Sequence, residues 1–494
     1  MTQMLFIGGI YLLGFCFGLL FRKRIPFPFI ALTGFLWGCM LYVIEVFVLY
    51  SLGIPYNLVS ATCLTGLVLA ILSIVNFLLG NWRLSRGDIS WLAGIFLVFT
   101  LASLAANLFN MTVVTLDSLR QIMVGREIAF DGFTPGVIDY LSSTGPFMLV
   151  LHSAGVLIGS EYLYTLIPCF SLSLFMIFIY VTFRSINQKT LGRFFALALT
   201  LLAALVLFSS TLVIYQSFYI HTNLPTAVYL FVAVATCWLA ISEENDAWLA
   251  FAVPSLVCVS LLRTETFLFA VFILFLVISL FKFSGRTRWF FTLPFLGLML
   301  LWYILFYVRF SRDTNVLSPA RILLLVFLLV CLGLYVFILR YRPVEQLIRS
   351  TVFYVVGGGV ILLMAGLLLF KTHNTITSLV VTLQNMFITG WWGAIWYAAV
   401  LGLVLAFTQP RFKNEHFFVL VLGVFFVFMI SLGSIRTLPY HLGWFDSGNR
   451  MLIHILPLVW YYLVLKYAPA FMKRAVSFET WFNAEKSSVL KARP

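Results

Sequence analysis

Long apolar blocks follow one another along this chain, and most of them are separated by only a few polar residues. A segment needs about 20 apolar residues to cross the hydrocarbon core of a bilayer as a helix, and fewer where the helix is broken or covered by protein. Backbone N–H and C=O groups must be satisfied internally in hydrocarbon, so such blocks fold as helices and not as open strands. The sequence therefore predicts an all-α fold, a polytopic transmembrane helical bundle.

These blocks make 62% of the 494 residues hydrophobic and leave only 10% charged, which excludes a soluble globular domain. The first block is followed by Arg22, Lys23 and Arg24 and lacks the basic start and small-residue cleavage site of a signal peptide, so we expect it to remain as a span. The expected spans lie near residues 4–21, 27–50, 58–80, 91–109, 161–183, 192–213, 223–241, 247–261, 265–282, 288–308, 320–340, 351–371, 391–408, 416–433 and 451–467.

Basic residues are concentrated in alternate loops between the blocks, for example at Arg83, Arg184, Arg340 and Arg411, and the formal net charge is +14. Because Lys and Arg in short loops stay on the cytoplasmic side, the N-terminus is expected outside and the tail 468–494 inside. The charge therefore reports orientation in the plasma (inner) membrane and does not indicate nucleic-acid binding.

The other loops share the outer side, and the longest of them is 110–160. Asp117, Arg120 and Gln121 have the i, i+3, i+4 spacing of one helix face, which predicts a surface helix. The run 137–158 is apolar but interrupted by Ser, Gly, Pro and His, which predicts a helix along the interface or a re-entrant one. We expect the chemistry in this loop, where carboxylates lie at the membrane edge.

Three groups of outer residues have both a structural and a functional interpretation. Asp117 opens a helix, where the dipole favours a carboxylate, but a partly desolvated carboxylate is also suited to act as a general base. Arg263 and Glu265 interrupt two apolar blocks, either as an ion pair that joins helices or as part of an outer cavity. Arg450 either snorkels to the interface or binds an anion such as a phosphate.

Asp446, His221 and Asp139 are further candidates for lining the same outer cavity. The outer histidines lack a close pair spacing and the seven cysteines form no CxxC pair, so we expect neither a metal nor another cofactor. Trp391 and Trp392 are typical of an interfacial aromatic belt.

Four motif-like stretches occur in order along the chain: TLDSLRQIMVGREIAFDG from Thr115, YLSSTGPFMLVLHSAGVLIG from Tyr140, LLRTETFLF from Leu261 and SGNRMLIHILPL from Ser447. Together they resemble the GT-C superfamily of polytopic membrane glycosyltransferases, including aminoarabinose- and mannosyltransferase-like members. The resemblance covers roughly 91–467, which leaves 1–90 as additional N-terminal transmembrane helices.

The resemblance implies a sugar donor linked to polyprenyl phosphate, an acceptor that is a lipid, a glycan or a protein, and contact with membrane lipids. Asp117 then corresponds to the catalytic base that takes the proton from the acceptor hydroxyl, and the reaction inverts the configuration at the anomeric carbon. Arg450 corresponds to the residue that holds the carrier phosphate, with Arg263 and Arg120 as further phosphate contacts. The outer loop has no DxD pair, unlike the metal-dependent oligosaccharide-transferring branch.

Two other functions fit the same pattern. A lipid-linked glycan polymerase or ligase also uses outer-loop arginines and polyprenyl lipids. A polytopic transporter or lipid flippase belongs to a different class, and transporters tend to show inverted repeats and broken helices near the bilayer midplane. The polar residues of this sequence gather in the outer loops, and its two halves do not resemble each other.

Overall fold

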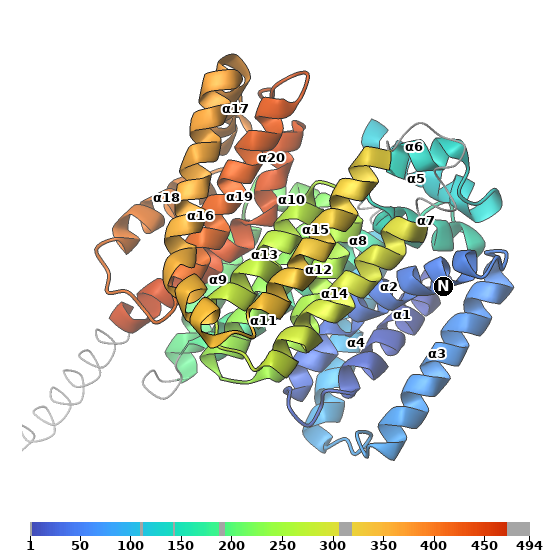
Figure 1. The fold of residues 1–494 in the computed structure, drawn as a ribbon. Helices are drawn as coiled ribbons and strands as arrows, with labels where there is room; N and C mark the ends of the chain where they lie inside the picture. The colour runs from blue at the N-terminus through green and yellow to red at the C-terminus, as the bar shows by residue number, and fades with distance from the viewer. Residues whose placement is uncertain (1, 109–111, 142–143, 187–192, 306–318, 472–494) are drawn as a thin grey trace, which may run out of the picture.

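The computed structural model describes residues 2–108, 112–141, 144–186, 193–305 and 319–471, and it is built from helices (Figure 1). These ranges contain no strand, and their one strand-like pairing is a parallel bridge between Val113 and Tyr219. Of the expected tail 468–494, residues 472–494 lie outside the described ranges. Nine helical segments of the described chain are long and apolar enough to cross a membrane, as expected of a multi-pass membrane protein.

These nine candidate spans are α1 (Thr2–Leu19), α2 (Phe27–Ser51), α3 (Leu58–Leu78), α4 (Arg86–Leu108), α8 (Leu166–Ser185), α11 (Asn223–Ser242), α16 (Arg342–Phe370), α19 (His416–Ile435) and the last segment, Ser447–Phe471. The last segment begins with α20 (Ser447–Met451) and the 3-10 turn η4 (Leu452–His454) and continues as a helix over 456–471.

Shorter or more polar helices fill the rest of the bundle. The apolar ones are α7 (Pro146–Leu157), α9 (Arg193–Phe208), α12 (Leu249–Leu262), α13 (Thr266–Leu280), α14 (Gly285–Leu305), α15 (Pro319–Ile338) and α18 (Ile395–Ala406). The others are α5 (Leu116–Phe130), α6 (Pro135–Leu141), α10 (Thr211–Gln216), η1 (Asp246–Trp248), α17 (Thr372–Gln384) and the π-helical turn η3 (Asn385–Thr389). Each expected span overlaps one of these helices, and the described ends agree within about five residues except at α16, which begins at Arg342 and not near 351. Residues 109, 192 and 306–308 of the expected spans lie outside the described ranges.

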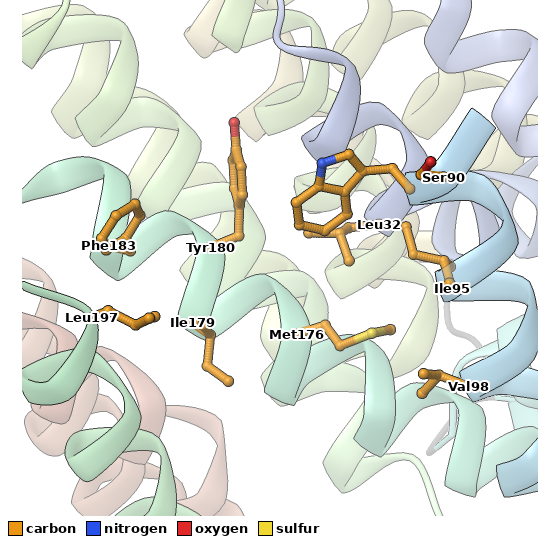
Figure 2. A pocket seen from close by; sticks show the side chains of 11 residues that line it. Leu32, Ser90, Ile95, Val98, Met176, Ile179, Tyr180, Phe183 and Leu197 are labelled. Carbon is orange, nitrogen blue, oxygen red and sulfur yellow. The ribbon is translucent and has the colours of Figure 1, made fainter. Parts of the chain in front are cut away.

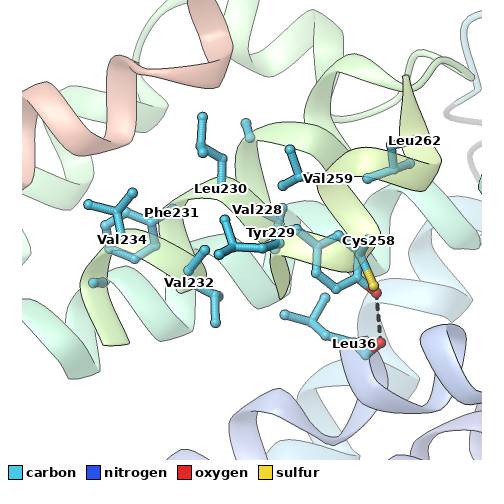
Figure 3. Packing of buried hydrophobic residues seen from close by; sticks show 14 of the residues in the cluster. Leu36, Val228, Tyr229, Leu230, Phe231, Val232, Val234, Cys258, Val259 and Leu262 are labelled. Carbon is cyan, nitrogen blue, oxygen red and sulfur yellow. Dashed lines mark hydrogen bonds between the residues drawn. The ribbon is translucent and has the colours of Figure 1, made fainter. Parts of the chain in front are cut away.

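Helix α11 lies at the centre of the bundle and is buried along nearly its whole length. A helix that is apolar all round is suited to such a position, because no face needs to meet water. Figure 3 shows its Tyr229 beside Cys258 of α12, and the Tyr229 hydroxyl donates to the backbone oxygen of Leu36 in α2 at 2.6 Å. Helix α2 also packs against α7 and α8, so the first spans share this core, while the division of the chain at residue 90 stays a prediction.

Helices α3 and α16 form part of the outer surface of the bundle. Both are apolar, yet very few of their residues are buried, and side chains such as Phe77 and Leu362 are exposed. An exposed apolar face of this size is expected where the neighbour is lipid and not water.

The two ends of the bundle differ in their polar contacts. We call one the arginine-rich end; its helix ends and connecting segments carry Arg22, Arg83, Arg184, Arg288, Arg340 and Lys413. We call the other the α5 end; it comprises α5, α6, α10, α17 and the connection 436–446, and the first two and α17 lie at the top of Figure 1. The sequence predicts that the α5 end faces outward and the arginine-rich end faces the cytoplasm.

The described part of the run 137–158 is mostly helical, and residues 142–143 lie outside the described ranges. It forms part of α6 and all of α7, and residues 146–155 of α7 are all buried. Helix α7 packs against α5, α2 and α12, so its apolar residues contact protein. The orientation of α7, along the membrane interface or re-entrant, stays a prediction.

Candidate active site

The side chains of Asp117 and Arg450 meet at the α5 end, although 333 positions separate them in the chain. Arg450 Nη1 donates to Asp117 Oδ2 at 2.9 Å. The Asp117 side chain is 54% exposed, whereas that of Arg450 is 12% exposed. The guanidinium is thus held within the protein, while the carboxylate remains accessible from outside.

Tyr219 is the third member of this cluster, and the sequence pattern did not predict it. Its hydroxyl oxygen accepts hydrogen bonds from Arg450 Nη1 at 2.7 Å and from Thr115 Oγ1 at 3.1 Å, and its O–H points to Asp117 Oδ2 at 3.5 Å. Burial raises the pKa of Tyr219, an effect that the charge of Arg450 partly offsets. The hydroxyl therefore stays protonated and links the base candidate to the cation. We call Asp117, Arg450 and Tyr219 the Asp117 cluster.

The start of α5 is fixed to the segment before α11. The bridge between Val113 and Tyr219 joins the two segments, and Ser118 Oγ donates to the backbone oxygen of Ile220 at 3.0 Å. Asp117 occupies the first turn of α5, where the helix dipole stabilises a negative charge. The structural interpretation of Asp117 and its role as a base are therefore compatible, because the same helix start places the carboxylate beside Arg450.

Asp446 shapes the turn that carries Arg450. Its carboxylate accepts hydrogen bonds from the backbone N–H groups of Gly448 at 2.8 Å, Asn449 at 3.2 Å and His441 at 3.1 Å. It is the N-cap of α20 and is buried. Asp446 thus satisfies helix-terminal amides and orients the residue four positions later.

Trp392 supports the same turn from the connection between η3 and α18. Its indole nitrogen donates to Asn449 Oδ1 at 2.5 Å, and the side chain is buried. The expectation that it belongs to an interfacial aromatic belt is wrong, because the ring lies inside the protein. Trp391 is half exposed and stacks on Trp444 with the ring centroids 5.0 Å apart.

Arg263 and Glu265 form an ion pair in the break between α12 and α13. Arg263 Nε donates to Glu265 Oε1 at 2.8 Å, and Arg263 Nη1 donates to Asn223 Oδ1 at 2.8 Å. The start of α7 presses on this break, since a Cβ at Gly145 would lie 2.0 Å from the backbone oxygen of Leu261. Among the described residues, no hydrogen bond or ion pair joins Arg263 to the Asp117 cluster.

His221 lies beside the Asp117 cluster. Its ring stacks on Tyr219 with the centroids 5.3 Å apart and the planes 7° apart. Burial lowers the pKa of His221 well below its usual value, and the positive charges of Arg450 and Arg263 lower it further. The imidazole is therefore neutral at physiological pH and can bond a ligand without adding charge.

Arg120 and Asp139 lie at the surface beside the cluster. Both are exposed, and the Arg120 guanidinium lies over the ring of Tyr140 with its carbon 5.3 Å from the centroid. Among the described residues, no hydrogen bond joins Arg120 to Asp117 or Arg450. An additional role for Arg120 in binding phosphate stays a prediction.

Several buried polar atoms around the cluster have no hydrogen-bond partner within the described chain. They include Arg450 Nε, Asn223 Nδ2 and both ring nitrogens of His454. A buried polar atom without a partner costs about 1–3 kcal/mol, so such atoms in one region indicate a place where a polar ligand can bind. The described residues contain no group of three His, Cys, Asp or Glu side chains that could hold a metal ion.

The comparisons with known proteins give no relative. No protein-family model matches the chain, and no curated protein or solved structure matches it.

Proposed function

We propose that this protein is a GT-C-like glycosyltransferase that moves a sugar from a polyprenyl-phosphate carrier to an acceptor hydroxyl at the α5 end of the bundle. The observation that carries the proposal is the Asp117 cluster, in which an exposed carboxylate contacts a fixed and largely buried arginine beside apolar spans. A base and a phosphate-binding cation in contact are the two groups that this reaction requires.

The proposed reaction is a single displacement. Asp117 accepts the proton of the acceptor hydroxyl while the hydroxyl oxygen forms a bond to the anomeric carbon. The bond between that carbon and the phosphate oxygen breaks, and the electron pair leaves with the carrier phosphate. Attack from the face opposite the leaving group inverts the anomeric configuration.

Arg450 is proposed to bind the carrier phosphate and to stabilise the negative charge that it gains as it leaves. Arginine suits this role because its planar group bonds phosphate oxygens in a fixed geometry. The hydroxyl of Tyr219 already bonds Arg450 Nη1 at 2.7 Å, while Arg450 Nε has no partner within the described chain. A cation that is oriented before the substrate arrives needs little reorganisation during the reaction.

The arrangement of charges favours an enzyme over a transporter. Arg263 with Glu265 and Arg450 with Asp117 pair at helix starts and breaks of the α5 end, not in the middle of a span. Glu45, a carboxylate inside α2, accepts a hydrogen bond from Thr65 Oγ1 at 2.5 Å and lies far from the Asp117 cluster in sequence. We propose that the α5 end faces outward from the plasma membrane and that the C-terminus is cytoplasmic.

The test is a reaction in reconstituted vesicles. Purified protein is supplied with a panel of polyprenyl-phosphate sugars that are labelled on the sugar and with a membrane extract that supplies lipid, glycan and protein acceptors, and the release of free polyprenyl phosphate and the formation of labelled product are measured together. We expect cleavage of at least one donor, with inversion at the anomeric carbon. Movement of an intact donor across the vesicle membrane without cleavage would instead show a transporter and contradict the proposal.

A further inference from the structure

An apolar cavity lies between α2, α4, α8 and α9, in the half of the bundle nearer the arginine-rich end. Its volume is about 690 Å³, and small-molecule sites typically measure about 300–1,000 Å³. Figure 2 shows side chains of α4 facing those of α8, with Leu32 of α2 behind them and Leu197 of α9 at one side.

Two rows of apolar side chains, one along α4 and one along α8, form the main walls of the cavity. Trp91, Ile95 and Val98 share one face of α4, and Ile179 and Phe183 share one face of α8. The part of α4 that lines the cavity, 90–98, is about 12 Å long at about 1.5 Å per residue. An elongated apolar cavity along a membrane span is suited to a hydrocarbon chain that lies parallel to the lipids around it.

Gly94 makes room in the α4 wall. A Cβ at this position would have no other atom within 4 Å, so the cavity continues past the helix backbone there. The same fact means that a larger side chain at Gly94 would enter the cavity without displacing a neighbouring helix.

Positive charge is concentrated where α4 begins. Arg86 precedes Ser90 of the cavity wall by one helical turn, and Ser90 Oγ donates to the backbone oxygen of Arg86 at 3.0 Å. Arg83 and Arg86 are exposed, and among the described residues neither is paired with a carboxylate. By contrast, Arg184 at the end of α8 is paired with Glu243.

We propose that this cavity binds a hydrocarbon chain of an anionic phospholipid and that Arg86 and Arg83 bind the lipid phosphate. The occupant is a lipid of the leaflet at the arginine-rich end, so the site is separate from the Asp117 cluster and does not depend on the function proposed for it. Trp91 and Tyr180 of the cavity wall belong to the residue types that anchor proteins at the level of lipid head groups. Juxtamembrane arginines attract anionic lipids, which supplies the selectivity that an apolar cavity lacks.

The test uses the full-length protein in lipid nanodiscs that contain a photoreactive phospholipid with a diazirine in its acyl chain. Phosphatidylglycerol is the anionic probe, and phosphatidylcholine with the same chain is the neutral probe. After irradiation, mass spectrometry of peptides measures the label in 90–98 and 176–183. We expect the anionic probe to label these segments several-fold more than the neutral probe does.

Two variants and two matched controls decide the outcome. Gly94→Leu should narrow the cavity and Arg86→Gln should remove the phosphate contact, so each should lower labelling by the anionic probe several-fold. Gly297→Leu is the control for the first, because Gly297 is exposed on α14 and a Cβ there also meets nothing within 4 Å. Arg342→Gln is the control for the second, because Arg342 is an exposed arginine at the start of α16. Neither control should change the labelling.

Equal labelling by the two probes, or unchanged labelling in Arg86→Gln, would overturn the proposal of an anionic head group. Unchanged labelling in Gly94→Leu would overturn the cavity as the site of the chain. Cross-links between two copies of the protein through these segments would show that the face is a protein interface and would also overturn it. The thermal unfolding midpoint of each variant is compared with that of wild type. This verifies that a variant with lower labelling is still folded.

Discussion

The two ends of the bundle use arginine and carboxylate side chains in different ways. At the arginine-rich end, Glu345 accepts hydrogen bonds from both Arg288 and Arg349, each at 2.6 Å, and Arg288 Nη1 also bonds the backbone oxygen of Leu339. At the α5 end, a single arginine, Arg450, instead shares its Nη1 between Asp117 and Tyr219.

The comparison separates charges that hold helices together from charges that are available to a ligand. Glu345 is 18% exposed and joins α14 to α16, so its ion pairs lie inside a helix contact. Asp117 is 54% exposed and joins α5 to the start of α20, so one partner of its ion pair faces outward. We therefore expect substitutions at the arginine-rich end to change stability and substitutions in the Asp117 cluster to change activity.

The largest effect is expected at Asp117. Asp117→Asn should lower turnover of the sugar donor by about 10²–10⁴-fold, because a positioned general base contributes about that much. The control is Asp131→Asn, since Asp131 is an exposed carboxylate at the opposite end of the same helix. Turnover of the purified variants is measured with the labelled donor, and wild-type turnover in Asp117→Asn would show that another group is the base.

Glu345→Gln tests the other half of the comparison. It leaves the buried guanidinium of Arg288 without its carboxylate, which should lower the free energy of unfolding by about 3 kcal/mol. Turnover per folded molecule should stay at the wild-type value. Glu161→Gln changes an exposed carboxylate and should alter stability by less than about 0.5 kcal/mol. A Glu345 variant as stable as the Glu161 variant would show that the network at the arginine-rich end does not hold helices together.

Tyr219→Phe should have a smaller effect, on activity alone. It removes the hydroxyl that bonds Arg450, and a hydrogen bond to a charged group contributes about 1.5–3 kcal/mol, so turnover should fall about tenfold or more. Tyr215→Phe is the matched control in the same segment, because the Tyr215 hydroxyl has no hydrogen-bond partner among the described residues. Equal turnover in the two variants would mean that Tyr219 does not position the arginine.

Substitution of His221 should have the smallest effect, a change in how the unfolding midpoint depends on pH. The pKa of His221 is lowered in the folded protein, so below about pH 6.5 the unfolded chain binds a proton that the folded chain resists. The unfolding midpoint of wild type should therefore fall as the pH is lowered below about 6.5, and His221→Gln should fall less steeply. His373→Gln, at an exposed position near the start of α17, should follow wild type. Parallel pH curves for wild type and His221→Gln would contradict the lowered pKa of His221.

The spans could be predicted from the sequence because hydropathy reports them directly. Helix α7 shows where this signal fails, since an apolar run with polar interruptions fits the membrane interface as well as a buried position. Trp392 was misplaced for a similar reason, because a tryptophan near a span end suggests a belt unless a distant partner such as Asn449 is known.

The candidate site was predictable only in its charged members. Asp117 and Arg450 stand out because charges near spans are costly and few, and the structure brings them into contact. Tyr219 could not be found in this way, because its place depends on the pairing of Val113 with Tyr219 across the chain. Uncharged residues whose role comes from a long-range contact leave no local pattern in the sequence.

The most direct test of the account is a double-mutant cycle on turnover with Asp117→Asn, Arg450→Gln and the variant that carries both. The account holds that the two side chains act as one unit, and losses within such a unit are far from additive. The double variant should retain about the same residual turnover as the less active of the two single variants. A loss in the double variant equal to the product of the two single losses would contradict the account, because the two groups would then act independently.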